Sequence, residues 1–290
     1  MVWLVFLLVL IVLLVYAIGY RLPYRILIPY RKTSNLRPDD LGFAYETLQL
    51  TTSDGLELEA YYVPAPGATR NLILLHGNAG CKEGYLEYLL HLVPAGTNVL
   101  LPDQRGHGRS QGRFHTFGYH EWRDVEAADH FLQSENDLPT ALFGHSAGGA
   151  VALSAAIRMP HFGAVVVQSS FANFAEITHA FGRRLTGLPL PEAFTRLILR
   201  RAAYLADFDP HAIVPEDLIR RVTVPTLVIH GEADERIPVD HGRRLFAASG
   251  SLHKQWYLVS GGGHDTVAEA GGERYFRTLT EFLGGELNKR

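Results

Sequence analysis

Residues 141–152 read Ala-Leu-Phe-Gly-His-Ser-Ala-Gly-Gly-Ala-Val-Ala. This pattern predicts an apolar strand, a tight Gly-X-Ser-X-Gly turn centred on Ser146, and a helix. Such a turn lifts a serine hydroxyl out of a sheet toward a base, at the cost of strained backbone at the serine. Gly144 and Gly148 lack the side chains that would collide where strand and helix cross. A glycine- and serine-rich turn without chemistry is the alternative; we favour a nucleophilic Ser146, with the N–H of Ala147 facing a developing oxyanion.

The composition limits the classes of function. The chain has 290 residues, of which 47% are hydrophobic and 20% are charged, and its net charge is −3. This length suits one large domain or two small ones, and the charge gives no sign of a nucleic-acid partner. Cys81 is the single cysteine, so no internal disulfide is expected and a reducing compartment is favoured. Among 14 histidines we find no metal-binding spacing, and His120-Glu121 lacks the second histidine of His-Glu-x-x-His.

Residues 1–20 are uncharged and almost wholly apolar. A helix of this length, at about 1.5 Å per residue, nearly crosses a bilayer core of about 30 Å. Trp3 near one end, and Tyr16 and Tyr20 near the other, are typical of membrane interfaces. A cleaved signal peptide is the alternative, but no basic residue precedes the apolar run. We therefore expect an uncleaved transmembrane helix over residues 1–20.

The basic residues come after this apolar run. Residues 21–42 contain three prolines and are expected to form a linker, and Arg21, Arg25, Arg31 and Lys32 lie within it. By the positive-inside rule these residues remain on the cytoplasmic side of the membrane. The sequence therefore predicts a single-pass membrane protein with a cytoplasmic catalytic domain at residues 43–290.

Short apolar runs alternate with helical periodicity through this domain. Residues 43–52 and 56–63 alternate between apolar and polar, and Ser53-Asp54-Gly55 joins them as a hairpin turn. Helical periodicity covers residues 83–93 and 119–133. Further short apolar runs are expected as buried strands: residues 71–75, 98–101, 164–168, 225–229 and 255–259. This order predicts an α/β fold with a mostly parallel sheet and helices on both faces.

Two chemically suitable side chains follow the last predicted strands. Asp234 comes after residues 225–229, and His264 comes after residues 255–259. A Ser–His pair needs a carboxylate to orient the imidazole and stabilise its cation, and the chain order Ser, Asp, His suits a parallel sheet. Glu232 and Glu235 are competing carboxylates. The non-catalytic alternatives are a helix N-cap for Asp234 and an ordinary loop histidine for His264. We assign Ser146, His264 and Asp234 as nucleophile, base and orienting acid.

Five segments in register carry a resemblance to a known family. They are His76-Gly-Asn-Ala-Gly80, Asp103-x-Arg-Gly-x-Gly-x-Ser110, Gly144-His-Ser-Ala-Gly-Gly149, His230-Gly-x-x-Asp234 and Gly263-His264. Over residues 43–285 the chain resembles the α/β-hydrolases. The His76–Gly80 loop and the apolar N-terminus resemble the membrane-associated ABHD and Bem-type hydrolases, which include depalmitoylases and lipid hydrolases. The chain lacks the N-terminal cysteine cluster that tethers the soluble depalmitoylases. The resemblance implies that the backbone N–H of Asn78 is the second oxyanion donor, beside that of Ala147.

The regular alternation breaks between residues 171 and 221, where this fold carries a lid. Apolar residues and arginines are interleaved here, which is typical of an interfacial amphipathic element. An ordinary helical cap with solvated arginines is the alternative. The apolar residues are Phe171, Phe174, Phe181, Leu185, Leu188, Leu190, Phe194, Leu197 and Ile198, and the arginines are Arg183, Arg184, Arg196, Arg200 and Arg201.

These features together predict a membrane-anchored serine hydrolase with an acyl-enzyme intermediate. The expected substrates are carboxylic esters or thioesters of acyl chains. No cofactor and no metal are expected, and the expected partners are the acyl substrate and membrane lipid. An aminopeptidase of the same fold is one alternative, although it needs acidic residues in the lid to hold a substrate amine, and the lid instead holds a cluster of arginines. A non-catalytic binding scaffold is the other, although such proteins usually lose a residue of the triad.

Overall fold

The computed structural model describes residues 2–187 and 191–287, without the side chains of residues 14, 15, 17, 18, 185 and 186. Three residues expected in the lid, Leu185, Leu188 and Leu190, therefore lie outside the described side chains.

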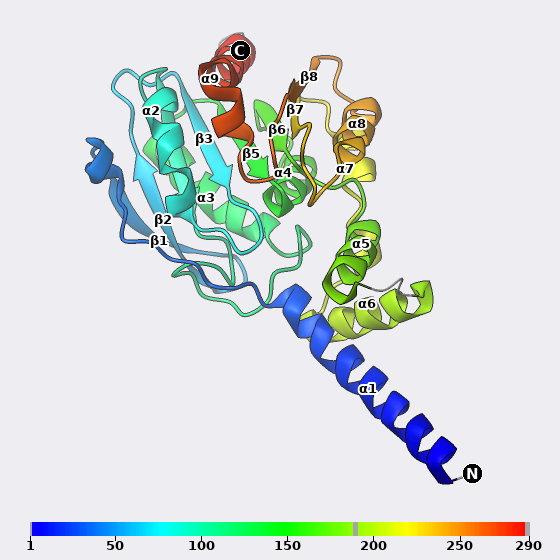
Figure 1. The fold of residues 1–290 in the computed structure, drawn as a ribbon. Helices are drawn as coiled ribbons and strands as arrows, with labels where there is room; N and C mark the ends of the chain where they lie inside the picture. Colours follow the sequence, from blue (N-terminus) through cyan, green and yellow to red (C-terminus); the bar gives the residue numbers. More distant parts are fainter. Residues whose placement is uncertain (1, 188–190, 288–290) are drawn as a thin grey trace.

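An eight-stranded sheet forms the centre of the described chain (Figure 1). The strand order across it is β1-β2-β4-β3-β5-β6-β7-β8. β1 pairs antiparallel with β2, β2 pairs antiparallel with β4, and every other neighbouring pair is parallel. The strands are β1 Glu46–Thr51, β2 Glu57–Val63, β3 Arg70–Leu75, β4 Thr97–Pro102, β5 Thr140–His145, β6 Ala164–Gln168, β7 Thr226–Gly231 and β8 Lys254–Val259. The mostly parallel sheet expected from the sequence is confirmed.

Helices cover both faces of this sheet, because the central strands have apolar side chains on both faces. Leu142 of β5 packs in one apolar cluster and its neighbour Phe143 packs in another. The first cluster includes residues of α3 Trp122–Glu135, α4 Ala147–Arg158, α7 Pro215–Arg221 and α8 Val239–Ala248. The second includes residues of α2 Leu89–Leu92 and α9 Val267–Leu287, which lie together in Figure 1.

The expected helix over residues 83–93 is only partly α-helical. Its first part is the 3₁₀ helix η2 Lys82–Tyr88, and only α2 continues as an α-helix. The side chains of Lys82 and Tyr85 make buried or half-buried hydrogen bonds to other segments of the molecule. These tertiary contacts outweigh the 3.6-residue periodicity that the sequence shows.

Helix α1 spans Val2–Leu27 and continues into the segment expected to be a linker. Its last residue, Leu27, is completely buried, and the Leu27 carbonyl accepts a 2.8 Å hydrogen bond from the N–H of His115. Beyond the helix, the Arg31 guanidinium donates to the carbonyls of Ser110 and Gly112, at 2.6 and 2.7 Å. The segment after residue 20 is therefore bound to the domain over much of its length.

The other end of α1 projects away from the sheet (Figure 1). Between residues 2 and 13 every side chain is large and apolar, and each is 48% to 82% exposed. The transmembrane helix expected over residues 1–20 is not found: over the part of the chain that is described, no helix is both long enough and apolar enough to cross a membrane.

The segment expected as a lid is helical and packs beside α1 (Figure 1). It contains α5 Phe174–Thr186 and α6 Glu192–Ala206, followed by the 3₁₀ helix η3 Pro210–Ala212 and by α7. A third apolar cluster joins Leu27 of α1 to Phe174 of α5 and Leu199 of α6. A 3₁₀ turn, η1 Pro38–Leu41, precedes β1.

Candidate active site

Ser146 lies in the turn between β5 and α4 and has a backbone that few residues adopt. Its φ is 54° and its ψ is −118°, which is a strained conformation for a residue with a side chain. The strand and helix cross very closely here. A Cβ at Gly144 would lie 2.2 Å from the Gly148 carbonyl oxygen, and a Cβ at Gly148 would lie 2.4 Å from that of Leu75. Both glycines are therefore required for the serine to project from the sheet.

His264 and Asp234 reach Ser146 from the ends of neighbouring parallel strands, β8 and β7. The His264 Nδ1–H donates to Asp234 Oδ2 at 2.8 Å. This bond leaves Nε2 free to accept from the Ser146 hydroxyl, at 3.0 Å. His264 and Asp234 are buried, whereas Ser146 is partly exposed. The structure thus brings the three predicted side chains into one hydrogen-bonded chain.

Asp234 also binds the turn in which it lies. Its Oδ1 accepts from the backbone N–H groups of Arg236 and Ile237, at 2.9 and 2.8 Å. Burial acts to raise the pKa of Asp234, but the hydrogen bond and charge of His264 and the Ile237 N–H outweigh it and keep this pKa below its usual value. The expected alternative, a helix N-cap, is wrong, because α8 begins only at Val239 with Pro238 before it. One Asp234 oxygen instead binds the turn, and the other binds His264.

Neither competing carboxylate has a hydrogen bond to His264 among the described residues. The Glu232 carboxylate accepts from the Ser260 hydroxyl at 2.7 Å. Glu235 is exposed, and its backbone carbonyl accepts from Arg184 at 3.0 Å. In the described residues, only Asp234 has a carboxylate hydrogen-bonded to the His264 ring.

His145, just before the serine, was not identified from the sequence as part of the site. Its Nε2–H donates to the backbone carbonyl of His264 at 3.0 Å, and its Nδ1 accepts from the Tyr85 hydroxyl at 2.7 Å. Burial, with a further contribution from the charge of His264, lowers the pKa of His145 to about 4, so the ring is neutral. It joins the serine turn, the histidine loop and the segment after β3. No spacing rule signals these contacts, because both partners, Tyr85 and His264, are distant from His145 in sequence.

The two residues expected to supply the oxyanion donors lie at the pocket of Ser146. Asn78 and Ala147 line the same pocket as the serine. Asn78 lies in the loop after β3, where the Gly80 N–H donates to the Gly77 carbonyl at 2.9 Å and Ala79 has a φ of 59°. Ala147 is the first residue of α4, and the N-terminus of a helix favours negative charge.

The segment 103–110 braces this loop. Asp103 accepts from both the backbone N–H and the ammonium of Lys82, at 2.8 and 2.6 Å. Lys82 is almost completely buried, and Asp103 and Glu59 compensate its charge. Arg105 forms ion pairs with Asp54 and Asp124. Buried charges paired in this way hold the loop geometry and are not free to bind substrate.

A pocket of about 400 Å³ opens at Ser146. Its walls are mainly aromatic and aliphatic, and two arginines, Arg25 of α1 and Arg236, also line it. The remaining lining residues are Ile26, Asn78, Phe117, Ser146, Ala147, Phe171, Phe174, Ile177, Thr178, Phe181 and Ile237. Pockets of this size and apolar character bind small or elongated apolar groups. The contributions of Arg25 and Ile26 were missed because α1 was expected to end before them.

One group of side chains has metal-ligand spacing. The ligand atoms of His145, His264 and Asp265 lie within 4.8 Å of one another. The ring nitrogens of both histidines already bind Tyr85, Asp234, Ser146 or a carbonyl. These hydrogen bonds suit proton transfer better than metal coordination.

Comparison with known proteins agrees with this architecture. A family model described as serine aminopeptidase, S33, matches residues 67–204. Uncharacterized protein MT2364 of Mycobacterium tuberculosis is 31% identical over 237 residues, which are 80% of this chain and 76% of that protein. Protein bem46 of Schizosaccharomyces pombe is 24% identical, covering 85% of this chain and 79% of its own. Uncharacterized membrane protein YNL320W of Saccharomyces cerevisiae is 27% identical, covering 85% and 82%.

Among solved structures, an esterase from Pyrococcus furiosus, Pf2001, superposes with a TM-score of 0.75. It is 22% identical, and the match covers 90% of this chain and 98% of that esterase. At this identity the likeness concerns the fold. The sheet order and the turn at Ser146 agree with this likeness, so the chain has the α/β-hydrolase fold, and its 31% identity places it in the same family as protein MT2364.

Proposed function

We propose that this protein is a serine hydrolase that cleaves carboxylic esters or thioesters of apolar acyl groups. The observation that carries the proposal is the hydrogen-bonded chain from Asp234 through His264 to Ser146 at an apolar pocket. This arrangement is the one that nucleophilic acyl transfer requires.

In the proposed reaction, Ser146 Oγ attacks the acyl carbonyl carbon while His264 Nε2 takes the hydroxyl proton. Asp234 stabilises the imidazolium that forms. The backbone N–H groups of Asn78 and Ala147 donate to the oxyanion of the tetrahedral intermediate. His264 then gives its proton to the departing alkoxide or thiolate, which leaves Ser146 acylated. A water molecule, deprotonated by His264, attacks the acyl-enzyme carbonyl carbon. His264 then returns the proton to Ser146 Oγ as the acyl–oxygen bond breaks, which releases the acid and restores the serine hydroxyl.

The pocket supports an acyl substrate over a peptide. Phe117, Phe171 and Phe174 offer an apolar wall to an alkyl or aryl chain. An aminopeptidase, as the description of the matching family model suggests, must neutralise a substrate ammonium. The described residues lining this pocket include two arginines and no carboxylate, which disfavours that alternative. A scaffold without catalysis is disfavoured because the hydrogen-bonded triad is complete.

We also propose that α1 attaches the protein to a membrane, with the hydrolase domain in the cytoplasm. The exposed apolar side chains of residues 2–13 support attachment, as does the description of YNL320W as a membrane protein. The basic residues after position 20 support the cytoplasmic side. In this arrangement α5 and α6 act as a lid near the bilayer surface.

A panel of chromogenic substrates tests the choice of reaction. It contains p-nitrophenyl esters of increasing acyl length, the matching thioesters, and an aminoacyl p-nitroanilide. We expect kcat/KM to be highest for the esters and thioesters and to rise with acyl length until the pocket is filled. Faster turnover of the aminoacyl anilide would favour the aminopeptidase, and no turnover of any substrate would favour the scaffold.

A further inference from the structure

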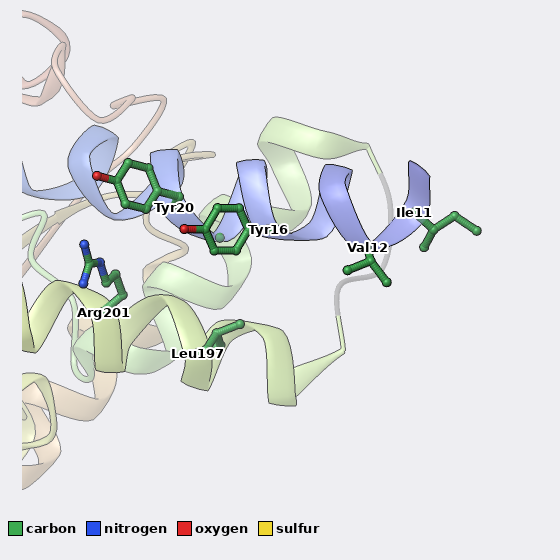
Figure 2. A pocket seen from close by; sticks show the side chains of 7 residues that line it. Ile11, Val12, Tyr16, Tyr20, Leu197 and Arg201 are labelled. Atoms are coloured by element: carbon green, nitrogen blue, oxygen red, sulfur yellow. The ribbon is translucent and has the colours of Figure 1, made fainter. Parts of the chain in front are cut away.

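A second cavity, of about 500 Å³, lies between α1 and α6 (Figure 2). It shares no lining residue with the catalytic pocket. Leu197 of α6 faces α1 in this groove and is half exposed. The lining residues are Ile11, Val12, Tyr16, Gly19, Tyr20, Leu197 and Arg201. We call this cavity the groove. Its described lining is apolar except at one end, where Arg201 is the only charged residue.

Arg201 has no anionic partner among the described residues. Its guanidinium lies 5.3 Å from the ring centres of Tyr20 and Tyr204, and its buried Nε has no hydrogen-bond partner. By contrast, Arg196 on the same helix pairs with Glu192. An unpaired guanidinium held between two aromatic rings is suited to bind an anion.

The apolar part of the groove continues into the exposed apolar surface of α1. Ile11 and Val12 belong both to the groove and to the run of exposed residues 2–13. A ligand that fits must therefore combine an apolar chain with one negative charge. We propose that the groove binds an acyl chain of an anionic membrane lipid, with the headgroup on Arg201.

The position of this site also relates it to catalysis. α1 contributes Tyr20 to the groove and Arg25 to the catalytic pocket, five residues further along. At about 1.5 Å per residue, this separation is about 7.5 Å along the helix axis. A lipid in the groove therefore fixes α1 against α6 beside the pocket mouth. The proposal rests on the proposed attachment of α1 to a membrane, but it requires no bond cleavage and so does not rest on the proposed hydrolysis.

A thiol at Leu197 makes occupancy of the groove measurable. Cys81 is the single cysteine and is buried, so Leu197→Cys introduces one accessible thiol. The full chain is placed in nanodiscs of phosphatidylcholine alone or of equal parts phosphatidylcholine and phosphatidylglycerol. The measured quantity is the rate of alkylation by a water-soluble maleimide. We expect phosphatidylglycerol to slow alkylation about fivefold, the effect of about 1 kcal/mol for one basic side chain near anionic lipid.

Two arginine variants separate a specific site from general surface charge. Arg201→Gln and Arg200→Gln remove the same charge from adjacent positions of α6, but Arg200 is exposed and does not line the groove. The slower alkylation in phosphatidylglycerol, which we call protection, is expected to be lost in Arg201→Gln and kept in Arg200→Gln. The proposal would be overturned if the alkylation rates were equal in the two lipid compositions. It would also be overturned if Arg201→Gln kept the protection from alkylation, or if both variants lost it equally.

Two further controls identify what occupies the groove and show whether the protection depends on the proposed hydrolase activity. Protection that depends on protein concentration and not on phosphatidylglycerol would mean that a second copy of the chain covers the groove, and would also overturn the proposal. The same measurement in a Ser146→Ala background is expected to give the same protection. The lipid site can therefore stand if the proposed hydrolase activity fails, and can fail if that activity stands.

Discussion

At the scale of single residues, the geometry of the site depends on a few side chains and on the glycines that let them approach one another. Ser146 projects because its backbone is strained and two glycines permit the crossing beneath it. Asp234 divides its oxygens between His264 and the turn. The sequence predicted these side chains because each follows a strand end. It did not reveal His145, whose hydrogen bonds to Tyr85 and the His264 carbonyl depend on how three distant loops meet.

Replacing the orienting carboxylate tests the assignment of Asp234. Asp234→Asn keeps the shape but favours the wrong imidazole tautomer, so kcat is expected to fall about 10⁴-fold. Glu232→Gln and Glu235→Gln are the matched controls, because their carboxylates do not touch His264. Steady-state kinetics on a short ester gives the comparison. A mild effect in Asp234→Asn with a large effect in either control would transfer the role to that glutamate.

His115 provides a test of how buried histidines affect stability. Burial lowers its pKa from 6.5 to about 4, and neither of its ring nitrogens has a hydrogen-bond partner in the described chain. The unfolded chain therefore takes up a proton at higher pH than the folded chain does. Above pH 6.5 this difference has no effect on the free energy of unfolding. As the pH falls from 6.5 toward 4, it lowers the free energy of unfolding by about 3 kcal/mol.

His115→Phe removes this titration and keeps an aromatic ring against His107 and Phe117. Urea unfolding in detergent is expected to show a shallower fall in unfolding free energy between pH 6.5 and pH 4 than in the wild type. At neutral pH the variant is expected to be no less stable. An unchanged pH dependence would show that His115 is not the group that titrates.

At the scale of elements, the strands were more predictable than the helices around the site. The strands are short apolar runs or, in the first hairpin, alternating apolar and polar residues between turns, and local sequence is enough to reveal both patterns. The end of α1 was not predictable, because Pro23 suggested a break whereas burial of Leu27 in the third apolar cluster stabilises the helix beyond it. Residues 82–88 became a 3₁₀ helix for a similar reason, since Lys82 and Tyr85 have partners elsewhere.

The last turn of α1 is therefore expected to be part of the folded domain. Leu27→Ala empties a fully buried site and should lower the free energy of unfolding by about 2–5 kcal/mol. Val9→Ala changes an exposed position of the same helix and should alter it by less than about 0.5 kcal/mol. Denaturant unfolding of both variants in the same detergent makes the comparison. Equally small changes in the free energy of unfolding for both variants would mean that the end of α1 is not part of the folded domain.

At the scale of the whole molecule, the proposed attachment through α1 fixes which side of the membrane the domain occupies. The basic residues lie on the C-terminal side of the apolar run, so the domain is expected in the cytoplasm. A reporter protein that functions only in the cytoplasm is fused after Arg290, and this fusion is expected to show reporter activity. A fusion that becomes glycosylated, or is active only outside the cytoplasm, would reverse the topology.

The central claim is that Ser146 is a nucleophile activated by His264 and Asp234. The most direct measurement is covalent labelling of the full chain with a fluorophosphonate, followed by mass-spectrometric mapping of the modified residue. The label is expected on Ser146, to be absent from Ser146→Ala, and to form far more slowly in His264→Ala; kcat of Ser146→Ala is expected to fall about 10⁶-fold. Labelling that persists at another serine in Ser146→Ala, or that fails in the folded wild-type protein, would contradict the account.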